Sequence, residues 1–360
     1  MKYRKIQFPK DESAHDCIIE WWYWNGNLKD KKGNKYAFMD CLFKADIKKV
    51  KIPFLKSPFD VGYFSHSLLS DVRRKKFYQE VNPLSIVSTD SFTKPLLFIN
   101  YTVPSLKGYT NYVMECVDKG RGSTGTTYHI KTSDIDLTMV STKRPLLEGG
   151  KGFIDLNSDK TYYYSLTNLA TTGRIKIEGK WIDVTGKSWM DHQWADVPYK
   201  KNKWSWFSIQ LNNNTEIVCF EYGYGKNKQR LASISHPDGR MSHYTDITIT
   251  PLDDKWRSSK TGAEYPLRWE VKIPQKKISL TVSAKGGIKD HEVNFGTINY
   301  WEGPLDVKGT AGGRKVNGDG FMELVGYATD YTKIRFLKDK TKQSLNQCAG
   351  YSKKVFGRYV

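Results

Sequence analysis

The sequence predicts an all-β protein of two domains, on the evidence of its strand periodicity, its turn residues and its length. Runs of alternating apolar and polar residues are separated by clusters of Gly, Asn, Asp and Pro, and long helical patterns are nearly absent. Many short strands at regular spacing are typical of a sandwich or a barrel. At 360 residues the chain exceeds the roughly 250–300 residues that one hydrophobic core usually supports. We therefore expect two β domains.

The predicted strands are spread over both halves of the chain. They are Glu20–Leu28, Lys35–Ala45, Pro95–Val103, Thr126–Met139, Thr161–Leu169, Trp204–Leu211, Glu216–Tyr224, Trp269–Ile273, Lys277–Ala284 and Gly320–Tyr327. Turn residues join several of these runs. Asp30–Gly33 lies between the first two, Asn212–Asn214 joins another pair, and Pro237–Gly239 is a strong hairpin signal.

The boundary between the domains is predicted within residues 197–203. Pro198 and a basic run interrupt two apolar stretches there. We accordingly assign residues 1–198 to an N-terminal domain and residues 199–360 to a C-terminal domain. The basic tail from Lys333 to Val360 is expected to form a short C-terminal extension, either packed as a helix or loose.

The chain is strongly basic, with a formal net charge of +19, which raises the question of nucleic-acid binding. Its lysines recur in short pairs beside turn residues, such as Lys31-Lys32 and Lys276-Lys277. Zinc-finger, homeodomain and RNP signatures are missing. The pattern favours a lysine-coated surface and no nucleic-acid partner. Peripheral association with anionic membranes is left open, and the sequence does not predict the oligomeric state.

The five cysteines are widely spaced and odd in number, and no two of them form a C-x-x-C pair. This spacing argues against a zinc knuckle or a thioredoxin-type site. Residues 1–17 contain no continuous apolar segment, and no later stretch approaches the ~18 apolar residues of a membrane span. From the sequence as it stands we expect a cytoplasmic protein. A signal upstream of it would instead make the protein secreted or periplasmic.

Several uncommon strings follow one another in a fixed order. They are Glu20-Trp21-Trp22-Tyr23-Trp24-Asn25-Gly26, Arg144-Pro145-Leu146-Leu147, Tyr162-Tyr163-Tyr164-Ser165, Gly186-Lys187-Ser188-Trp189-Met190-Asp191-His192-Gln193-Trp194, Tyr300-Trp301-Glu302-Gly303, and the segment Gly320–Tyr327. This ordered set, from about Glu20 to Tyr327, resembles the carotenoid 1,2-hydratase and AttH-like family. The resemblance implies two lipocalin-like antiparallel β-barrel domains packed together. It also implies hydrophobic, unsaturated substrates: water addition to terpenoid double bonds, or cycloaddition of polyketide chains in distant relatives.

The residue types in the D-H-x-W string suit such chemistry. Adding water to an unactivated alkene requires a strong proton donor, a pocket that tolerates a carbocation, and one held water. His192 and Trp194 alternate onto the same face of an extended segment, where the indole stabilises a cation by roughly 0.5–2 kcal/mol. Asp191 and His192 hold or relay the proton in this hypothesis. Asp191 fits a structural role, pinning a loop by hydrogen bonds, equally well.

A third candidate, Glu221, shares a strand face with Ile217 and Cys219. A carboxylate among apolar neighbours costs several kcal/mol if it is charged and unpaired, so Glu221 is neutral, paired or functional. The resemblance places a proton-donating acid on the strand after the D-H-x-W string, and Glu221 matches that position by approximate spacing. Cys219 stands where the hydratases carry Tyr, which sets this chain apart from them. We expect Glu221→Gln to abolish turnover and leave binding largely intact.

The remaining candidates line a pocket or are structural. Trp24, Trp194, Trp206 and Tyr222 are predicted to bind substrate, while the block Trp21–Trp24 faces both ways on its strand, so at least half of it packs in a core or between domains. Glu20 is interpreted as structural, paired with an arginine inside the barrel. His236 and His243 flank a turn but lack a third ligand for a metal.

The leading hypothesis is a hydratase-like enzyme, or a related isomerase or cyclase, that needs neither cofactor nor metal. It would protonate a hydrophobic terpenoid or polyketide-type substrate in an apolar pocket between or inside the two barrels. The alternative is a non-catalytic binding protein for a lipid or terpenoid, because lipocalin-type barrels often only hold a ligand. A structural protein with filled barrels is the third alternative.

Overall fold

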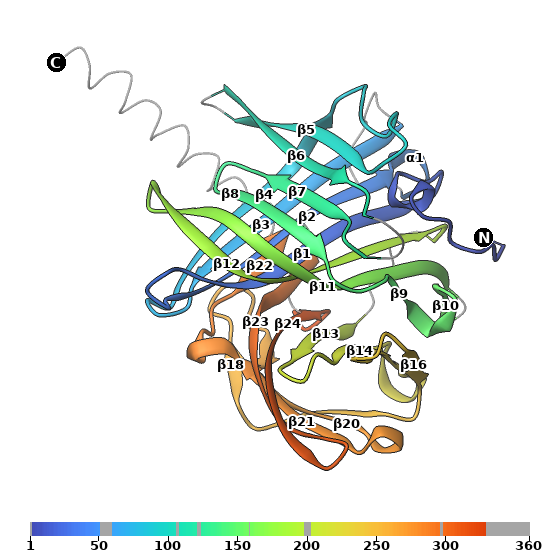
Figure 1. The fold of residues 1–360 in the computed structure, drawn as a ribbon, viewed down its shortest axis with the longest axis vertical. Coiled ribbons are helices and arrows are strands. Elements are labelled where there is room, and N and C mark those ends of the chain that lie inside the picture. Colours follow the sequence, from blue (N-terminus) through green and yellow to red (C-terminus); the bar gives the residue numbers. More distant parts are fainter. Residues whose placement is uncertain are drawn as a thin grey trace.

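The computed structural model describes residues 2–50, 60–105, 108–120, 124–157, 159–197, 203–295 and 298–328, and it confirms the all-β prediction (Figure 1). The predicted tail Lys333–Val360 lies outside the described residues. The first sheet contains β1 (Ile19–Lys29), β2 (Lys35–Asp46), β3 (Val61–Asp71), β4 (Lys76–Val87), β5 (Phe98–Ser105), β6 (Gly108–Asp118), β7 (Thr127–Lys131), β8 (Ile135–Ser141), β9 (Leu146–Leu147), β10 (Phe153–Leu156), β11 (Asp159–Ile177) and β12 (Lys180–Ala195).

This first sheet closes on itself. Its strands follow the order β11-β12-β1-β2-β3-β4-β5-β6-β7-β8, and β8 pairs again with β11 to complete a ten-stranded antiparallel barrel. The two short strands β9 and β10 pair with β11 outside this ring. Closure leaves the barrel strands with paired edges, so that alternate residues face a common interior.

The second sheet is open and curls into a half-barrel. It contains β13 (Trp204–Leu211), β14 (Glu216–Tyr222), β15 (Gln229–Ser235), β16 (Met241–Tyr244), β17 (Thr248–Pro251), β20 (Arg268–Ile273), β21 (Ile278–Ala284), β22 (Glu292–Phe295), β23 (Ile298–Ala311) and β24 (Arg314–Val325). A separate hairpin is formed by β18 (Lys255–Arg257) and β19 (Glu264–Pro266). The predicted lipocalin-like architecture is confirmed, with one closed barrel and one curled half-barrel. The two sheets are built from residues 19–195 and 204–325, on either side of the segment 197–203.

The two sheets pack through the outer face of β1, β2 and β12 against β13, β23 and β24, which lie directly below them in Figure 1. Tyr23 points out of the barrel and donates a hydrogen bond to Glu302 of β23 at 2.8 Å. Its neighbours Trp22 and Trp24 point into the barrel and are fully buried there. The strand β1 is aromatic on both faces because one face lines the barrel and the other lines the domain interface.

One predicted strand, Thr126–Met139, is wrong in its extent, because it divides into β7 and β8. The Thr132 hydroxyl accepts hydrogen bonds from the backbone N–H groups of Asp134 and Ile135. This local side-chain hydrogen bonding stabilises a turn in place of a continuous strand. The alternation of apolar and polar residues continues through this turn, so periodicity alone does not reveal the turn.

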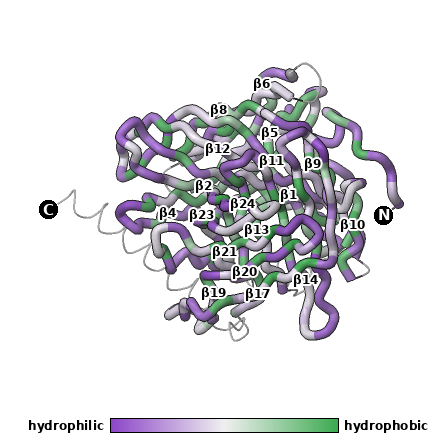
Figure 2. Tube along the Cα trace, turned by 60° about the horizontal axis from the view of Figure 1, so that its bottom comes forward, coloured by the Kyte–Doolittle hydropathy of each residue, from purple (hydrophilic) through white to green (hydrophobic). Residues whose placement is uncertain are grey.

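Helical structure is sparse. It comprises α1 (Ile47–Val50) and the 3₁₀ turns η1 (Lys10–Glu12), η2 (Glu148–Gly150), η3 (Gly225–Asn227), η4 (Pro274–Lys276) and η5 (Lys285–Gly287). Within the described residues, no helix has the length and apolar content needed to cross a membrane. Figure 2 shows hydrophobic residues alternating with polar ones along the strands and hydrophilic residues gathered at many of the turns.

Candidate active site

The polar side chains inside the barrel follow from the register of β1. Glu20 points inward and pairs with Trp194 of β12 on one side and Lys44 of β2 on the other. Two residues further along β1, Trp22 pairs with His192. Because residues two apart on a strand share a face, these side chains form two successive layers of the barrel interior.

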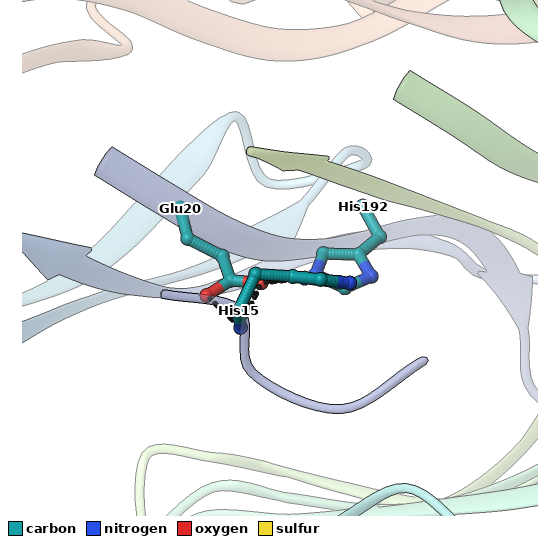
Figure 3. A group of neighbouring side chains, drawn as sticks. All are labelled: His15, Glu20 and His192. Atoms are coloured by element: carbon teal, nitrogen blue, oxygen red, sulfur yellow. Dashed lines mark hydrogen bonds and ion pairs between the residues drawn. The ribbon is translucent and has the colours of Figure 1, made fainter. Parts of the chain in front are cut away.

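The buried carboxylate of Glu20 forms hydrogen bonds with two imidazoles, those of His15 and His192 (Figure 3). Oε1 of Glu20 is 3.0 Å from Nε2 of His192 and 2.6 Å from Nδ1 of His15. The backbone N–H of His15 also donates to the same carboxylate. Glu20 and His192 are completely buried, and His15 is 12% exposed. His15 reaches the site from the segment that precedes β1.

Lys44 supplies the positive charge that balances Glu20. Its Nζ lies 3.1 Å from Oε2 of Glu20 and also donates to the backbone carbonyl of His15. Removing a carboxylate from water is costly unless it is paired and hydrogen-bonded. Here the ammonium and the two imidazoles meet that requirement, since both oxygens of Glu20 accept hydrogen bonds.

The protonation states of Glu20 and His192 follow from these contacts. Burial by itself would raise the pKa of Glu20, but hydrogen bonds from His15 and His192 and the charge of Lys44 outweigh it and lower that pKa to about 2. Burial lowers the pKa of His192, partly opposed by Glu20. An ionised Glu20 beside a neutral His192 favours the tautomer that carries its proton on Nε2. The lone pair is then on Nδ1, which lies 3.3 Å from the Tyr164 hydroxyl.

Aromatic rings enclose the network. Trp194 stacks on His15 with ring centroids 3.9 Å apart and an interplanar angle of 3°. Trp22 stacks on His192 at 4.9 Å, and Tyr164 meets the same imidazole edge to face at 5.4 Å. A positive charge that develops beside these rings is stabilised by their π faces.

The segment before β1 covers this end of the barrel. The Trp22 indole donates to the backbone carbonyl of Glu12 at 3.0 Å, and the Tyr128 hydroxyl donates to the Glu12 carboxylate at 2.9 Å. Arg4 forms two hydrogen bonds with Asp11, whose Oδ1 lies 3.3 Å from Nε2 of His15. This segment therefore covers one end of the barrel and places His15 beside Glu20.

Two imidazoles and a carboxylate are also a donor set that zinc accepts. The ligand atoms of His15, Glu20 and His192 lie within 4.8 Å of one another, and they are the one such group among the residues that the structure describes. Lys44 already places a positive charge on Glu20, and it would repel a metal ion. The arrangement therefore suits proton transfer better than metal binding.

The structure brings three of the predicted site residues together. His192, Trp194 and Trp24 all lie inside the N-terminal barrel. The prediction that His192 and Trp194 share a face is confirmed, because their ring centroids are 4.9 Å apart. Glu20 belongs to the same site, and its partner is Lys44 rather than the predicted arginine.

Asp191 does not lie with His192. It points out of the barrel into the domain interface, where it accepts hydrogen bonds from Tyr163, Ser165 and Trp189 at 2.6–2.7 Å. Trp206 lies in the same interface and donates to the Tyr163 hydroxyl. Consecutive residues of an extended strand face opposite sides, which separates Asp191 from His192.

Glu221 and Tyr222 lie at β14 in the half-barrel, away from the His192 site. Glu221 is buried but forms ion pairs with Lys228 at 2.5 Å and Arg230 at 2.7 Å. It lines a pocket of about 440 Å³ with Lys203 and Tyr327. Tyr222 is half-buried on the other face of β14. The expected grouping of Asp191, His192 and Glu221 in one pocket is wrong, because the three residues lie in three separate places.

The sequence reasoning missed His15 and Lys44. His15 lies in a segment without strand periodicity, so no pattern predicts where its side chain points. Lys44 was detectable in principle, because residues 38, 40, 42 and 44 of one predicted strand share a face, and a lysine there requires a buried partner.

Comparison with known proteins identifies the family of this chain. The AttH-like family model matches residues 1–327. Two relatives are a dehydratase (asqC) from Emericella nidulans, 24% identical over 58% of this chain, and kievitone hydratase from Fusarium solani subsp. phaseoli, 26% identical over 53% of it. The chain spans 66% and 56% of their lengths, less than two thirds in each case.

Two crystal structures share the fold. One is a Nitrosomonas europaea protein assigned to AttH, with a TM-score of 0.69, 23% identity, and coverage of 90% of this chain and 98% of that one. The other is kievitone hydratase from Nectria haematococca, with a TM-score of 0.66, 16% identity, and coverage of 91% and 94%. The family match covers both sheets and the segment that carries His15. The chain therefore belongs to the AttH-like family.

Proposed function

We propose that this protein is a hydratase or dehydratase that transfers a proton through His192 inside the N-terminal barrel, without a cofactor. The single observation that carries the proposal is the fully buried Glu20 carboxylate hydrogen-bonded to His192 and His15 among aromatic rings. The names of the two relatives, a dehydratase and a hydratase, support this reaction class. The resemblance noted in the sequence favours a hydrophobic, unsaturated substrate.

The roles of the residues follow from the proton positions. In dehydration, Nδ1 of His192 takes a proton from the carbon next to the one that bears the hydroxyl group, directly or through the Tyr164 hydroxyl. The C–O bond breaks, and the oxygen leaves as water after receiving a second proton. Glu20 stabilises the imidazolium that forms on His192. Hydration is the reverse, with protonated His192 as the acid and water as the nucleophile.

The surroundings of His192 suit such a reaction. The faces of Trp22 and Trp194 stabilise a carbocation-like transition state, an effect of roughly 0.5–2 kcal/mol for each well-placed ring. Apolar walls strengthen the charge interactions, because the effective dielectric constant inside a protein is lower than that of water. A carrier protein would need the same apolar interior but not a charged network at its end.

The test uses whatever molecule the protein retains. Native mass spectrometry of the purified full chain identifies a bound small molecule, which is extracted and incubated with the protein in ¹⁸O-labelled water. The proposal expects a product that differs by one water, with the label entering on hydration. A retained lipid or terpenoid that never changes would instead support the non-catalytic carrier.

A further inference from the structure

A second group of polar side chains lies one layer further along the interior of the N-terminal barrel. Trp24 of β1 pairs with Asp40 of β2, Asp40 pairs with Ser67 of β3, and Ser67 pairs with Glu80 of β4. Trp24 follows Trp22 by two residues on the same face of β1. The layer of side chains that contains Asp40 therefore lies about 7 Å along the strand from the layer that contains His192.

Three groups in this region lack hydrogen-bond partners among the described residues. They are both carboxyl oxygens of Asp40, Nε1 of Trp24 and the hydroxyl of Tyr101 on β5. All three side chains are 0% exposed. Leaving one such group unsatisfied costs roughly 1–3 kcal/mol, and native interiors rarely retain several together.

The hydroxyls of the neighbouring Tyr112 and Tyr128 have hydrogen-bond partners, in contrast to these three groups. The Tyr112 hydroxyl, opposite Tyr101 in the register, donates to Glu80 at 2.7 Å. Tyr128, whose ring centroid is 5.5 Å from that of Trp24, donates to Oε1 of Glu12, whereas Oε2 of Glu12 has no partner among the described residues. The unpaired set therefore consists of one carboxyl and two donors, a combination that recognises a single oxygen atom with both lone pairs and a proton.

The Asp40 carboxyl favours its protonated form at pH 7. Burial first, and then the charge of Glu80, raise its pKa to about 8. Ser67 lies close enough to favour the ionised form in part, although its hydroxyl does not meet the geometry of a hydrogen bond to either carboxyl oxygen. Tyr101 lies in the same part of the interior, because its ring is 5.3 Å from that of Tyr112, which donates to Glu80. Burial first, and then the charge of Asp40, raise the pKa of Tyr101.

We propose that Asp40, Trp24 and Tyr101 bind the hydroxyl oxygen of an otherwise apolar substrate, and that Asp40 is the acid that protonates this oxygen. The inference rests on the proposed function and completes it, because His192 accounts for one proton of a dehydration and Asp40 accounts for the other. The ligand class is an alcohol with a hydrophobic carbon skeleton. Trp24 donates to its oxygen, and the carboxyl and the phenol supply the remaining hydrogen bonds.

The reaction balances with these two groups. The carboxyl proton of Asp40 moves to the hydroxyl oxygen, the C–O bond breaks with its electron pair on oxygen, and water leaves. The adjacent carbon loses a proton to His192, and its C–H electron pair forms the double bond. In an allylic alcohol such as geraniol the proton comes instead from the carbon attached to the far end of the allylic system, and the existing double bond shifts toward the carbon that lost the oxygen. The proton on His192 then returns to the Asp40 carboxylate through water. Asp40 and His192 flank β1 from opposite sides, so acid and base face the substrate from two directions.

The first test measures the acid itself and needs no turnover. Infrared difference spectra between wild type and Asp40→Asn at pH 7 are expected to show the carbonyl band of a protonated carboxyl that the variant lacks. Geraniol, an allylic alcohol, is expected to shift this band, whereas myrcene, the hydrocarbon formed when geraniol loses water, is not. The matched control is Glu302→Gln, which removes a buried acid of the domain interface and should keep the band and its shift.

The second test separates binding from proton donation. Asp40→Asn keeps a hydrogen-bonding group, so it should retain the preference for geraniol over myrcene in tryptophan-fluorescence titrations. Asp40→Leu should reduce that preference by about tenfold, the effect of one lost hydrogen bond. Tyr101→Phe should reduce it as well, and it remains informative if an Asp40 variant fails to fold.

The outcomes distinguish this inference from the proposed function. Absence of the carboxyl band, or a band that geraniol does not shift, overturns the role of Asp40 whatever the enzyme does. A band that shifts with geraniol while no alcohol is dehydrated supports the oxygen site and contradicts the proposed function. A shift that accompanies conversion of geraniol to myrcene, lost in Asp40→Asn, supports both.

Discussion

Nε2 of His192 lies 3.0 Å from Oε1 of Glu20, although the two residues are 172 positions apart in the chain. The ladder between β1 and β12 brings them together, because Trp22 and His192 are partners in its register and Glu20 precedes Trp22 by two residues. The site thus exists only when the first and last long strands of the barrel pair. The proton-transfer network therefore depends on the β1–β12 ladder.

Replacing Glu20 by glutamine should destabilise the protein by about 3–5 kcal/mol, because Lys44 and the two imidazoles lose their buried counter-charge. The pKa of Glu20 is lowered to about 2 in the folded state, from an ordinary value of 4.5. Its stabilisation is therefore complete above pH 4.5 and is lost as the pH falls toward 2. Urea unfolding followed at pH 7 and pH 3 measures both effects.

The matched control for this variant is Glu178→Gln. Glu178 is an exposed acid with ion pairs to Arg74 and Lys76, and its replacement should leave the unfolding midpoint unchanged, as is usual for surface pairs. Equal effects of the two substitutions would contradict the buried ion network.

The domain interface should make stability depend on pH in the opposite direction. Glu323 is partly buried opposite Glu302 on β23, near Asp191, and the desolvation there raises its pKa to about 7. A raised pKa means that its contribution is complete below pH 4.5 and is lost as the pH rises toward 7. The loss is about 1.4 kcal/mol per pH unit for one such group.

The variant Glu323→Gln keeps an acceptor for the Trp204 indole, which donates to Glu323 at 2.7 Å. Its free energy of unfolding should fall less than that of wild type between pH 5 and pH 7.5. The pH dependence that remains in the variant comes from the other groups with raised pKa values. One of them is Asp191, whose pKa is raised by burial to about 6. Parallel profiles for variant and wild type would show that Glu323 does not titrate in this range.

Lys143 should be a main attachment between the two sheets. Its buried Nζ lies 2.5 Å from Oε2 of Glu216 and donates to the carbonyls of Asn214 and His236. Lys143→Met leaves the Glu216 carboxylate without its counter-charge, so we expect a loss of about 3–5 kcal/mol in unfolding free energy. Lys187→Met removes an exposed lysine that lines a groove together with Lys143 and Asn168, and it should have little effect. A small loss for Lys143→Met would show that the interface does not depend on this ion pair.

Chelators should not affect turnover. The positive charge of Lys44 on Glu20 opposes a metal ion at His15, Glu20 and His192. Dialysis against EDTA should therefore leave the rate of water addition or loss unchanged, and added Zn²⁺ should not raise it. A rate that falls on dialysis and returns with Zn²⁺ would show that these three residues bind a metal.

Periodicity predicted much of the fold and part of the site. The alternation of β1 predicts that Trp22 and Trp24 face one side and Tyr23 the other, and the structure agrees. The same alternation pairs His192 with Trp194 and separates both from Asp191. A period of two therefore identifies which neighbours can act together on a strand, and it argues against treating Asp191 and His192 as a pair.

The rest of the site depends on contacts that periodicity does not contain. The partner of Glu20 follows from the register between β1 and β2, and His15 comes from a segment outside any strand. Glu221 illustrates the limit of spacing, because it lies on a strand as predicted but in the other sheet. Distance along the sequence says little about which barrel a side chain faces.

The measurement that tests the account most directly compares wild type, His192→Gln and Glu221→Gln for exchange of labelled oxygen from ¹⁸O water into the natural ligand or its product. We predict a loss of at least about 100-fold for His192→Gln, as expected for a general acid–base residue. Glu221→Gln, in a separate pocket, should stay within a few-fold of wild type. Full activity of His192→Gln, or its loss in Glu221→Gln, would contradict a catalytic centre in the N-terminal barrel.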